Sequence, residues 1–115
     1  PIYMQIMDKI RAAIVSGELA AGAKVASVRE LAEDFGVNPN TMQRALAELE
    51  REGLLISERT TGRFVTTDTA IIDQVRKEAA EKMGIPLDTL HSTLYRAKQW
   101  IKKYYEEQFH QLDDK

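Results

Sequence analysis

The stretch that begins at Ser27 constrains the fold more than any other part of the chain. Ser27, followed by Glu30 three positions later, is a capping box, in which Ser27 accepts a hydrogen bond from the first helical turn and Glu30 reaches back to the Ser27 N–H. Gly36 then supplies the left-handed residue that commonly ends a helix. Asn38 caps a second helix, with Pro39 at its first position, where a missing N–H costs nothing. These signals predict a helix-turn-helix.

Apolar residues at helical spacing give each of these two helices one buried face. The first helix is predicted to bury Val28, Leu31, Ala32 and Phe35. The second is predicted to bury Met42, Ala45, Leu46 and Leu49, and to expose Asn40, Gln43, Arg44 and Ala47. No acidic residue occurs between Phe35 and Ala47. Because short or planar polar side chains pair with base edges and phosphates in a major groove, a DNA-reading helix is favoured over a purely structural helical hairpin.

An amphipathic helix is predicted before this stretch, in the segment PIYMQIMDKIRAAIVSG. Gly17 is its predicted end. The helix is expected to close the core over the helix-turn-helix. For Tyr3 we favour packing in the core, with a dimer or domain contact as the alternative.

A β-hairpin wing is predicted after the second helix, in the segment LLISERTTGRFVTT. Its turn is expected at Arg59–Gly62. Leu54 and Ile56 share one side of the first strand, and Phe64 faces the core if the return strand pairs with it. Arg63 is predicted either to enter a narrow minor groove, where negative potential favours it, or to be a solvated hairpin arginine. We give these two alternatives equal weight.

The segment after residue 67 has a helical pattern throughout. Asp68 is a plausible cap for a first helix, Gly84 to Pro86 interrupt the pattern, and a second helix begins near Leu87. A two-helix hairpin cannot bury both apolar stripes against itself, so burial in a partner chain, giving a two-fold dimer, is favoured. A Trp and Tyr cluster also suits a small-molecule pocket, but little chain is left to enclose a ligand. The predicted dimer-interface residues are Ile72, Val75, Leu90, Leu94, Ala97, Trp100, Ile101 and Tyr104.

The charge balance argues against indiscriminate binding to nucleic acid. The formal net charge is −2 and the calculated pI is about 5.7, whereas a nucleic-acid-binding domain is usually basic. Positive potential toward DNA must therefore come from local sorting, with acids on the far faces and with Arg29, Arg44, Arg59 and Arg63 near the groove. This predicts a salt-sensitive binder that depends on being a dimer.

The sequence does not predict catalysis, a cofactor or a metal site. The chain has no Cys, which excludes disulfides and favours a cytoplasmic location. Its two histidines, His91 and His110, are too far apart on the last predicted helix to converge. Neither a nucleophile elbow nor a phosphate-binding glycine loop is present. No apolar run is long enough to span a membrane, and no signal peptide is visible.

Four motifs occur in a characteristic order and spacing: SVRELA, VNPNT, RALAELEREGL and G-x-F-V. Together they resemble the N-terminal DNA-binding domain of the GntR family of bacterial transcription factors, from Pro1 to about Thr66. The short helical tail is similar to that of YtrA-like members. The resemblance implies a mainly α winged helix-turn-helix domain with a small β-hairpin over residues 1–67, and a helical dimerisation segment over residues 68–115.

The resemblance also implies a function and a set of contact residues. The function is that of a homodimeric regulator, in the usual mode a repressor, that binds an inverted-repeat operator in double-stranded DNA. The implied DNA-contacting residues are Ser27, Arg29, Asn38, Asn40, Thr41, Gln43, Arg44, Thr61, Gly62 and Arg63. A winged-helix module that binds proteins is the alternative, and RNA binding ranks last because no exposed aromatic row alternates with basic residues. The sequence does not indicate a small-molecule effector.

Overall fold

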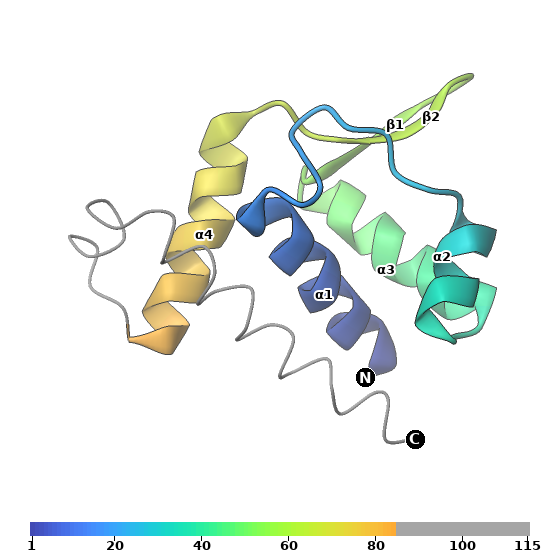
Figure 1. Cartoon of the computed structure of the whole chain (residues 1–115), viewed down its shortest axis with the longest axis horizontal. Coiled ribbons are helices and arrows are strands. Elements are labelled where there is room, and N and C mark those ends of the chain that lie inside the picture. Colours follow the sequence, from blue (N-terminus) through green and yellow to red (C-terminus); the bar gives the residue numbers. More distant parts are fainter. Residues whose placement is uncertain (85–115) are drawn as a thin grey trace.

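A computed structural model describes residues 1–84, of which the Met83 side chain is not described (Figure 1). The elements are α1 (Ile2–Ser16), α2 (Val28–Phe35), α3 (Pro39–Arg51), β1 (Leu55–Glu58), β2 (Gly62–Val65) and α4 (Thr69–Met83). The predicted winged helix-turn-helix is confirmed. Of the two predicted C-terminal helices, the first is α4, and the second lies outside the described residues.

The predicted caps set the ends of α2 and α3. The Ser27 hydroxyl accepts from the Glu30 N–H at 3.2 Å, and it also donates to the Glu30 carboxylate, which differs from the expected return bond to the Ser27 N–H. Asn38 Oδ1 accepts from the Asn40 N–H at 2.7 Å. Gly36 ends α2 with φ of 68°, in the left-handed region that favours glycine. The turn between the two helices is therefore specified by local chemistry.

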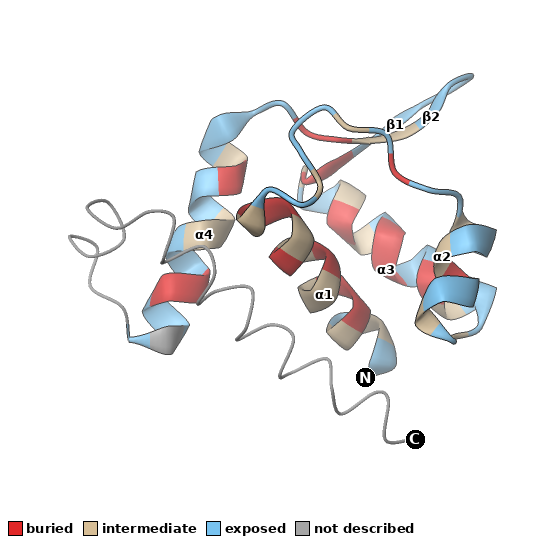
Figure 2. Ribbon diagram, viewed as in Figure 1, coloured by how far each residue is buried: buried red, intermediate tan, exposed pale blue. Residues whose placement is uncertain are grey.

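The core lies between α1, α3 and the base of the hairpin (Figure 2). α1 packs along α3, and α2 closes the other side of α3. The largest side chains with almost no exposed surface include Ile6, Met42, Leu46, Leu49, Leu54, Leu55 and Val65. Burying such side chains contributes roughly 1.5–3 kcal/mol each, which fixes the orientation of α3.

The wing is an antiparallel hairpin in which Leu55 pairs with Val65 and Ile56 with Phe64. The predicted alternation is wrong by one position, because Leu54 precedes the strand and its N–H bonds to the Leu49 carbonyl at the end of α3. Leu55 therefore begins the strand facing the core, and Ile56 faces outward with 45% of its surface exposed. Phe64 pairs with Ile56 and therefore shares its outward side of the hairpin. It is half-buried but does not belong to the core cluster, so the prediction that Phe64 faces the core is wrong.

α4 packs against α1 of the same chain. Asp68 caps α4 as predicted, by accepting from the Ala70 N–H at 3.0 Å. Ile72, predicted in a dimer interface, is 7% exposed and belongs to the core cluster of its own chain. Arg76, with a side chain 13% exposed, donates to the Val15 carbonyl at the end of α1 at 3.4 Å. Among residues 1–84, no helix is long and apolar enough to cross a membrane.

Candidate nucleic-acid interface

The outer face of α3 presents polar side chains to solvent. Asn40, Gln43 and Arg44 are exposed, and so is the small residue Ala47 that follows them. Thr41, predicted to contact DNA, is half-buried toward the side of the helix. Glu48 is the first acidic residue of α3, so its N-terminal two turns carry no carboxylate. This half of α3 therefore suits the negative potential of a DNA groove.

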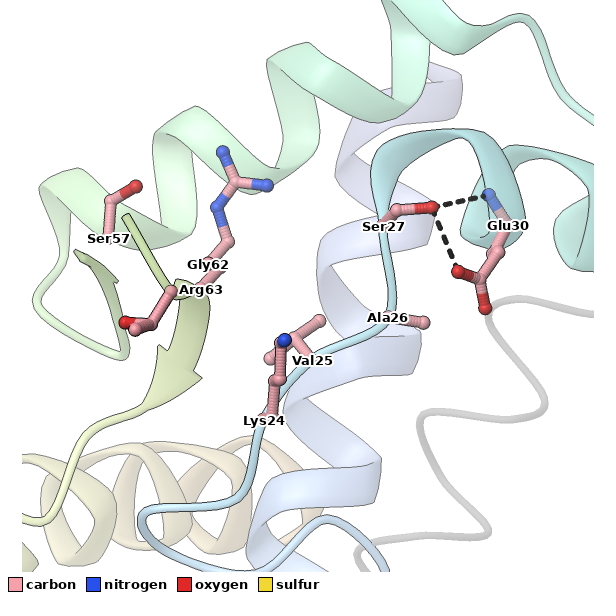
Figure 3. Close-up of a pocket in the computed structure, with 9 residues that line it drawn as sticks. Lys24, Val25, Ala26, Ser27, Glu30, Ser57, Gly62 and Arg63 are labelled. Atoms are coloured by element: carbon pink, nitrogen blue, oxygen red, sulfur yellow. Dashed lines mark hydrogen bonds between the residues drawn. The ribbon is translucent and has the colours of Figure 1, made fainter. Parts of the chain in front are cut away.

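A hollow of about 650 Å³ separates the start of α2 from the wing. Figure 3 shows Ser27 and Glu30 on one side of the hollow, with Ser57, Gly62 and Arg63 across from them. Lys24, which the sequence analysis missed, lies at its edge. A Cβ at Gly62 would lie 3.1 Å from Lys24 Cε, and Gly62 has φ of 113°, so glycine fits both the space and the backbone.

Arginine pairing divides the arginines of the described chain into two groups. Four form ion pairs with carboxylates: Arg11, Arg51, Arg63 and Arg76. Within residues 1–84, the remaining three have no carboxylate within ion-pair distance: Arg29, Arg44 and Arg59. These three lie on α2, on α3 and in the wing turn. Of the four arginines predicted to lie near the groove, three thus have no carboxylate partner within residues 1–84, and their position at DNA stays a prediction.

Arg63 is not the solvated hairpin arginine of one prediction, and its entry into a minor groove stays a prediction. Its Nε donates to Glu50 Oε1 near the end of α3, and its side chain is only 15% exposed. The ion pair joins the wing to the recognition helix, and a DNA contact by this guanidinium would compete with Glu50. Thr61 and Gly62 are exposed at the tip, as predicted for residues that approach a DNA backbone. Their contact with DNA, like that of Arg63, stays a prediction.

Arg44 lies over the ring of Tyr3, with its Cζ 4.0 Å from the ring centroid. Tyr3 is half-buried and packs against the core, as predicted, but its contact with the second helix was missed. No local sequence signal could have revealed this pair, because the two residues lie on different helices. The distance is within the range of a cation–π interaction.

Most of the predicted dimer interface cannot be placed. Leu90, Leu94, Ala97, Trp100, Ile101 and Tyr104 lie outside the described residues, as do His91 and His110. Val75 is half-buried against the core of its own chain, beside Ile72. Residues 1–84 contain no group of three or more His, Cys, Asp or Glu side chains that could hold a metal ion.

A capped helix pair, a hairpin wing and a second helix whose first two turns carry no carboxylate define a winged helix-turn-helix protein of the DNA-binding class. Residues 2–65 match the family described as "Bacterial regulatory proteins, gntR family". The chain belongs to this family and is a DNA-binding transcriptional regulator, not an enzyme.

Individual relatives agree with this assignment. The chain is 33% identical to the HTH-type transcriptional repressor YtrA of Bacillus subtilis strain 168, over 90% of this chain and 83% of that protein. It is 40% identical to the transcriptional regulator YhcF of the same organism, over 72% of this chain and 69% of that protein. A solved GntR family transcriptional regulator from Listeria monocytogenes is 39% identical, with a TM-score of 0.71, covering 90% of this chain and 94% of that one. The predicted likeness to YtrA is therefore confirmed.

Proposed function

We propose that this regulator acts as a repressor, binding an inverted-repeat operator as a homodimer. The observation that carries the proposal is the exposed face of the first two turns of α3, which carries no carboxylate. It is accompanied by Arg29 on α2 and Arg59 in the wing turn, neither of which has a carboxylate partner in residues 1–84. Repression is supported by the likeness to YtrA, which is named as a repressor. A dimer that covers a promoter needs no activating surface.

The roles of the predicted residues follow from their positions. Asn40, Gln43 and Arg44 project from α3 and would contact base edges or phosphates. Ser27, Arg29 and Asn38 lie at the starts of helices and would contact the DNA backbone, as would the wing tip.

Two copies are needed because one α3 covers only a few base pairs. Two recognition helices related by a two-fold axis would enter successive major grooves, which makes the operator an inverted repeat. The segment 68–115 is the proposed source of the dimer contacts. The net charge of −2 also favours a requirement for two binding surfaces, because one protomer offers few uncompensated cations.

A fluorescence-anisotropy titration tests the proposal. The probe is the DNA upstream of the protein's own gene, with random-sequence duplex as competitor, at about 150 mM salt. We expect tight binding to a fragment with an inverted repeat, and sedimentation equilibrium should give the mass of a dimer. A strictly monomeric protein, or equal affinity for every duplex, would overturn the proposal.

A further inference from the structure

Two polar contacts fix α1 beside α3, where Figure 1 shows them next to each other. Tyr3 lies under Arg44. Arg11 Nη2 donates to both Glu52 carboxylate oxygens, at 2.7 and 2.5 Å. The contact residues are eight positions apart on both segments, which is about 12 Å along a helix. The two contacts therefore lie at the same spacing along the interface between α1 and α3.

Arg11 keeps its charge in this contact. Burial alone would lower the pKa of Arg11, but hydrogen bonds and charge from Glu52 and Asp8 outweigh burial and raise the pKa above its ordinary value. The guanidinium therefore stays charged at every pH where the protein works.

Within residues 1–84, the hydrogen-bond donors of Arg44 have no side-chain carboxylate partner. Glu48 lies one turn further along α3, at a spacing that commonly pairs with arginine, but it pairs instead with Arg51 at 3.5 Å. The Tyr3 ring attracts the cation but offers no lone-pair acceptor from its face, so the N–H donors remain available.

We propose that Tyr3 is a positioning residue for DNA recognition: it holds the Arg44 guanidinium in place on α3 with its donors directed to the operator. Arginine has a long side chain that loses much rotamer freedom when it binds. The stack on Tyr3 removes part of that freedom before DNA arrives, so less is lost on binding. This inference rests on the proposed role of Arg44 in DNA contact.

The competing explanation is that Tyr3 only fills space. Tyr3 is half-buried and packs against the core, so its loss also weakens packing. A double-mutant cycle separates the two roles, because a packing defect weakens binding whether or not Arg44 is present. If Tyr3 acts by positioning Arg44, substitution of Tyr3 should no longer weaken DNA binding once Arg44 has been removed.

The cycle compares the wild-type protein with Tyr3→Leu, Arg44→Ala and the double variant. The probe is a duplex enriched by the wild-type protein from a random library, titrated at reduced salt so that weak binding is measurable. We expect Tyr3→Leu to weaken binding about two- to fivefold, the scale of a cation–π contact at an exposed site. In the Arg44→Ala background the same change should have less than a twofold effect. Equal losses in both backgrounds, or no loss in either, would overturn the proposal.

Two control variants come from the same helical turn. Tyr3→Phe keeps the ring and should bind within twofold of the wild type. Met4→Ala alters a neighbouring side chain that is 49% exposed, and it should leave affinity unchanged. Thermal unfolding checks that each variant is folded, and Tyr3→Met replaces Tyr3→Leu if the latter unfolds.

The free protein provides a test that needs no DNA. Protons above an aromatic ring are shifted upfield, so the Arg44 side-chain resonances should be displaced in the wild type and in Tyr3→Phe but not in Tyr3→Leu. Undisplaced resonances in the wild type would refute the stack itself. If the stack is present but no enriched duplex is found, the proposed binding to an operator is wrong. The proposed positioning role of Tyr3 is then wrong as well.

Discussion

At the start of α3, some side chains stabilise the helix and others are exposed to solvent. Asn38 faces its own backbone, accepting from the Asn40 N–H, while the Asn40 side chain is exposed. Asn38 therefore caps the helix in addition to its proposed contact with the DNA backbone, whereas Asn40 is proposed for DNA contact alone.

Replacing these two asparagines separately should give opposite results. Asn38→Ala removes a helix cap and should lower the free energy of unfolding by about 1 kcal/mol. Asn40→Ala removes no cap, so it should leave stability nearly unchanged and weaken binding to an enriched duplex by about 1 kcal/mol or more, if Asn40 contacts a base. Urea denaturation and anisotropy titrations measure the two quantities. If Asn40→Ala instead destabilises the protein and binds DNA normally, the proposed division of roles is wrong.

At the scale of elements, the wing is joined to α3 through one ion pair and to the segment before α2 through backbone hydrogen bonds. The Val25 N–H donates to the Arg63 carbonyl at 2.8 Å, and the Val65 N–H to the Ala23 carbonyl at 2.9 Å. The base of the wing therefore belongs to a short three-stranded arrangement. Nearer its tip, Arg63 pairs with Glu50 of α3.

The pair between Arg63 and Glu50 should order the wing. Its side chains are 15% and 29% exposed, so we expect a contribution near the upper end of the surface range, about 1 kcal/mol. Both Arg63→Met and Glu50→Gln should then speed hydrogen exchange of the wing amides roughly fivefold. Hydrogen-exchange mass spectrometry measures this, with Arg59→Met as the control because Arg59 has no carboxylate partner in residues 1–84.

Affinity for DNA distinguishes the two possible uses of Arg63. If Arg63 acts by holding the wing, Glu50→Gln should weaken operator binding as Arg63→Met does. If Arg63 contacts a phosphate instead, Glu50→Gln frees the guanidinium and should strengthen binding. A stronger complex with Glu50→Gln would therefore favour a direct contact between Arg63 and DNA.

At the scale of the whole molecule, local signals were predictable and contacts between distant elements were not. The caps at Ser27, Asn38 and Asp68 involve neighbouring residues, so their chemistry is visible in the sequence. The placement of Ile56 failed because alternation in a strand depends on where the strand begins, and Leu54 still belongs to the end of α3.

Tertiary contacts decided the remaining differences. Tyr3 meets Arg44, and Arg63 meets Glu50, only after the helices and the wing have packed. Ile72 has an apolar side chain that suits a dimer interface or a core equally well, and only the docking of α4 on α1 shows that its own chain already covers it. Composition and periodicity indicate that a side chain will be buried, but not by which partner.

The acidic chain makes the salt dependence of binding a strict test of the entire proposal. Among residues 20–65, four cations have no carboxylate partner within the described chain: Lys24, Arg29, Arg44 and Arg59. If each neutralises one phosphate, a dimer makes eight such contacts. The logarithm of affinity should then fall against the logarithm of salt concentration with a slope of roughly −7.

Single substitutions should change this slope by a predictable amount. Arg29→Ala removes one contact per protomer, and hence two per dimer, so the slope should become shallower by roughly 2. Lys77→Ala on α4 removes an equal charge outside the proposed DNA-binding surface, although it changes the net charge identically. Lys77 lies in the segment proposed for the dimer contacts, so sedimentation equilibrium must show an intact dimer, and the slope should then be unchanged. Titrations from about 50 to 200 mM salt give the slopes. Equal effects of the two substitutions would mean that net charge governs binding, and the sorting of arginines around α3 would lose its proposed role.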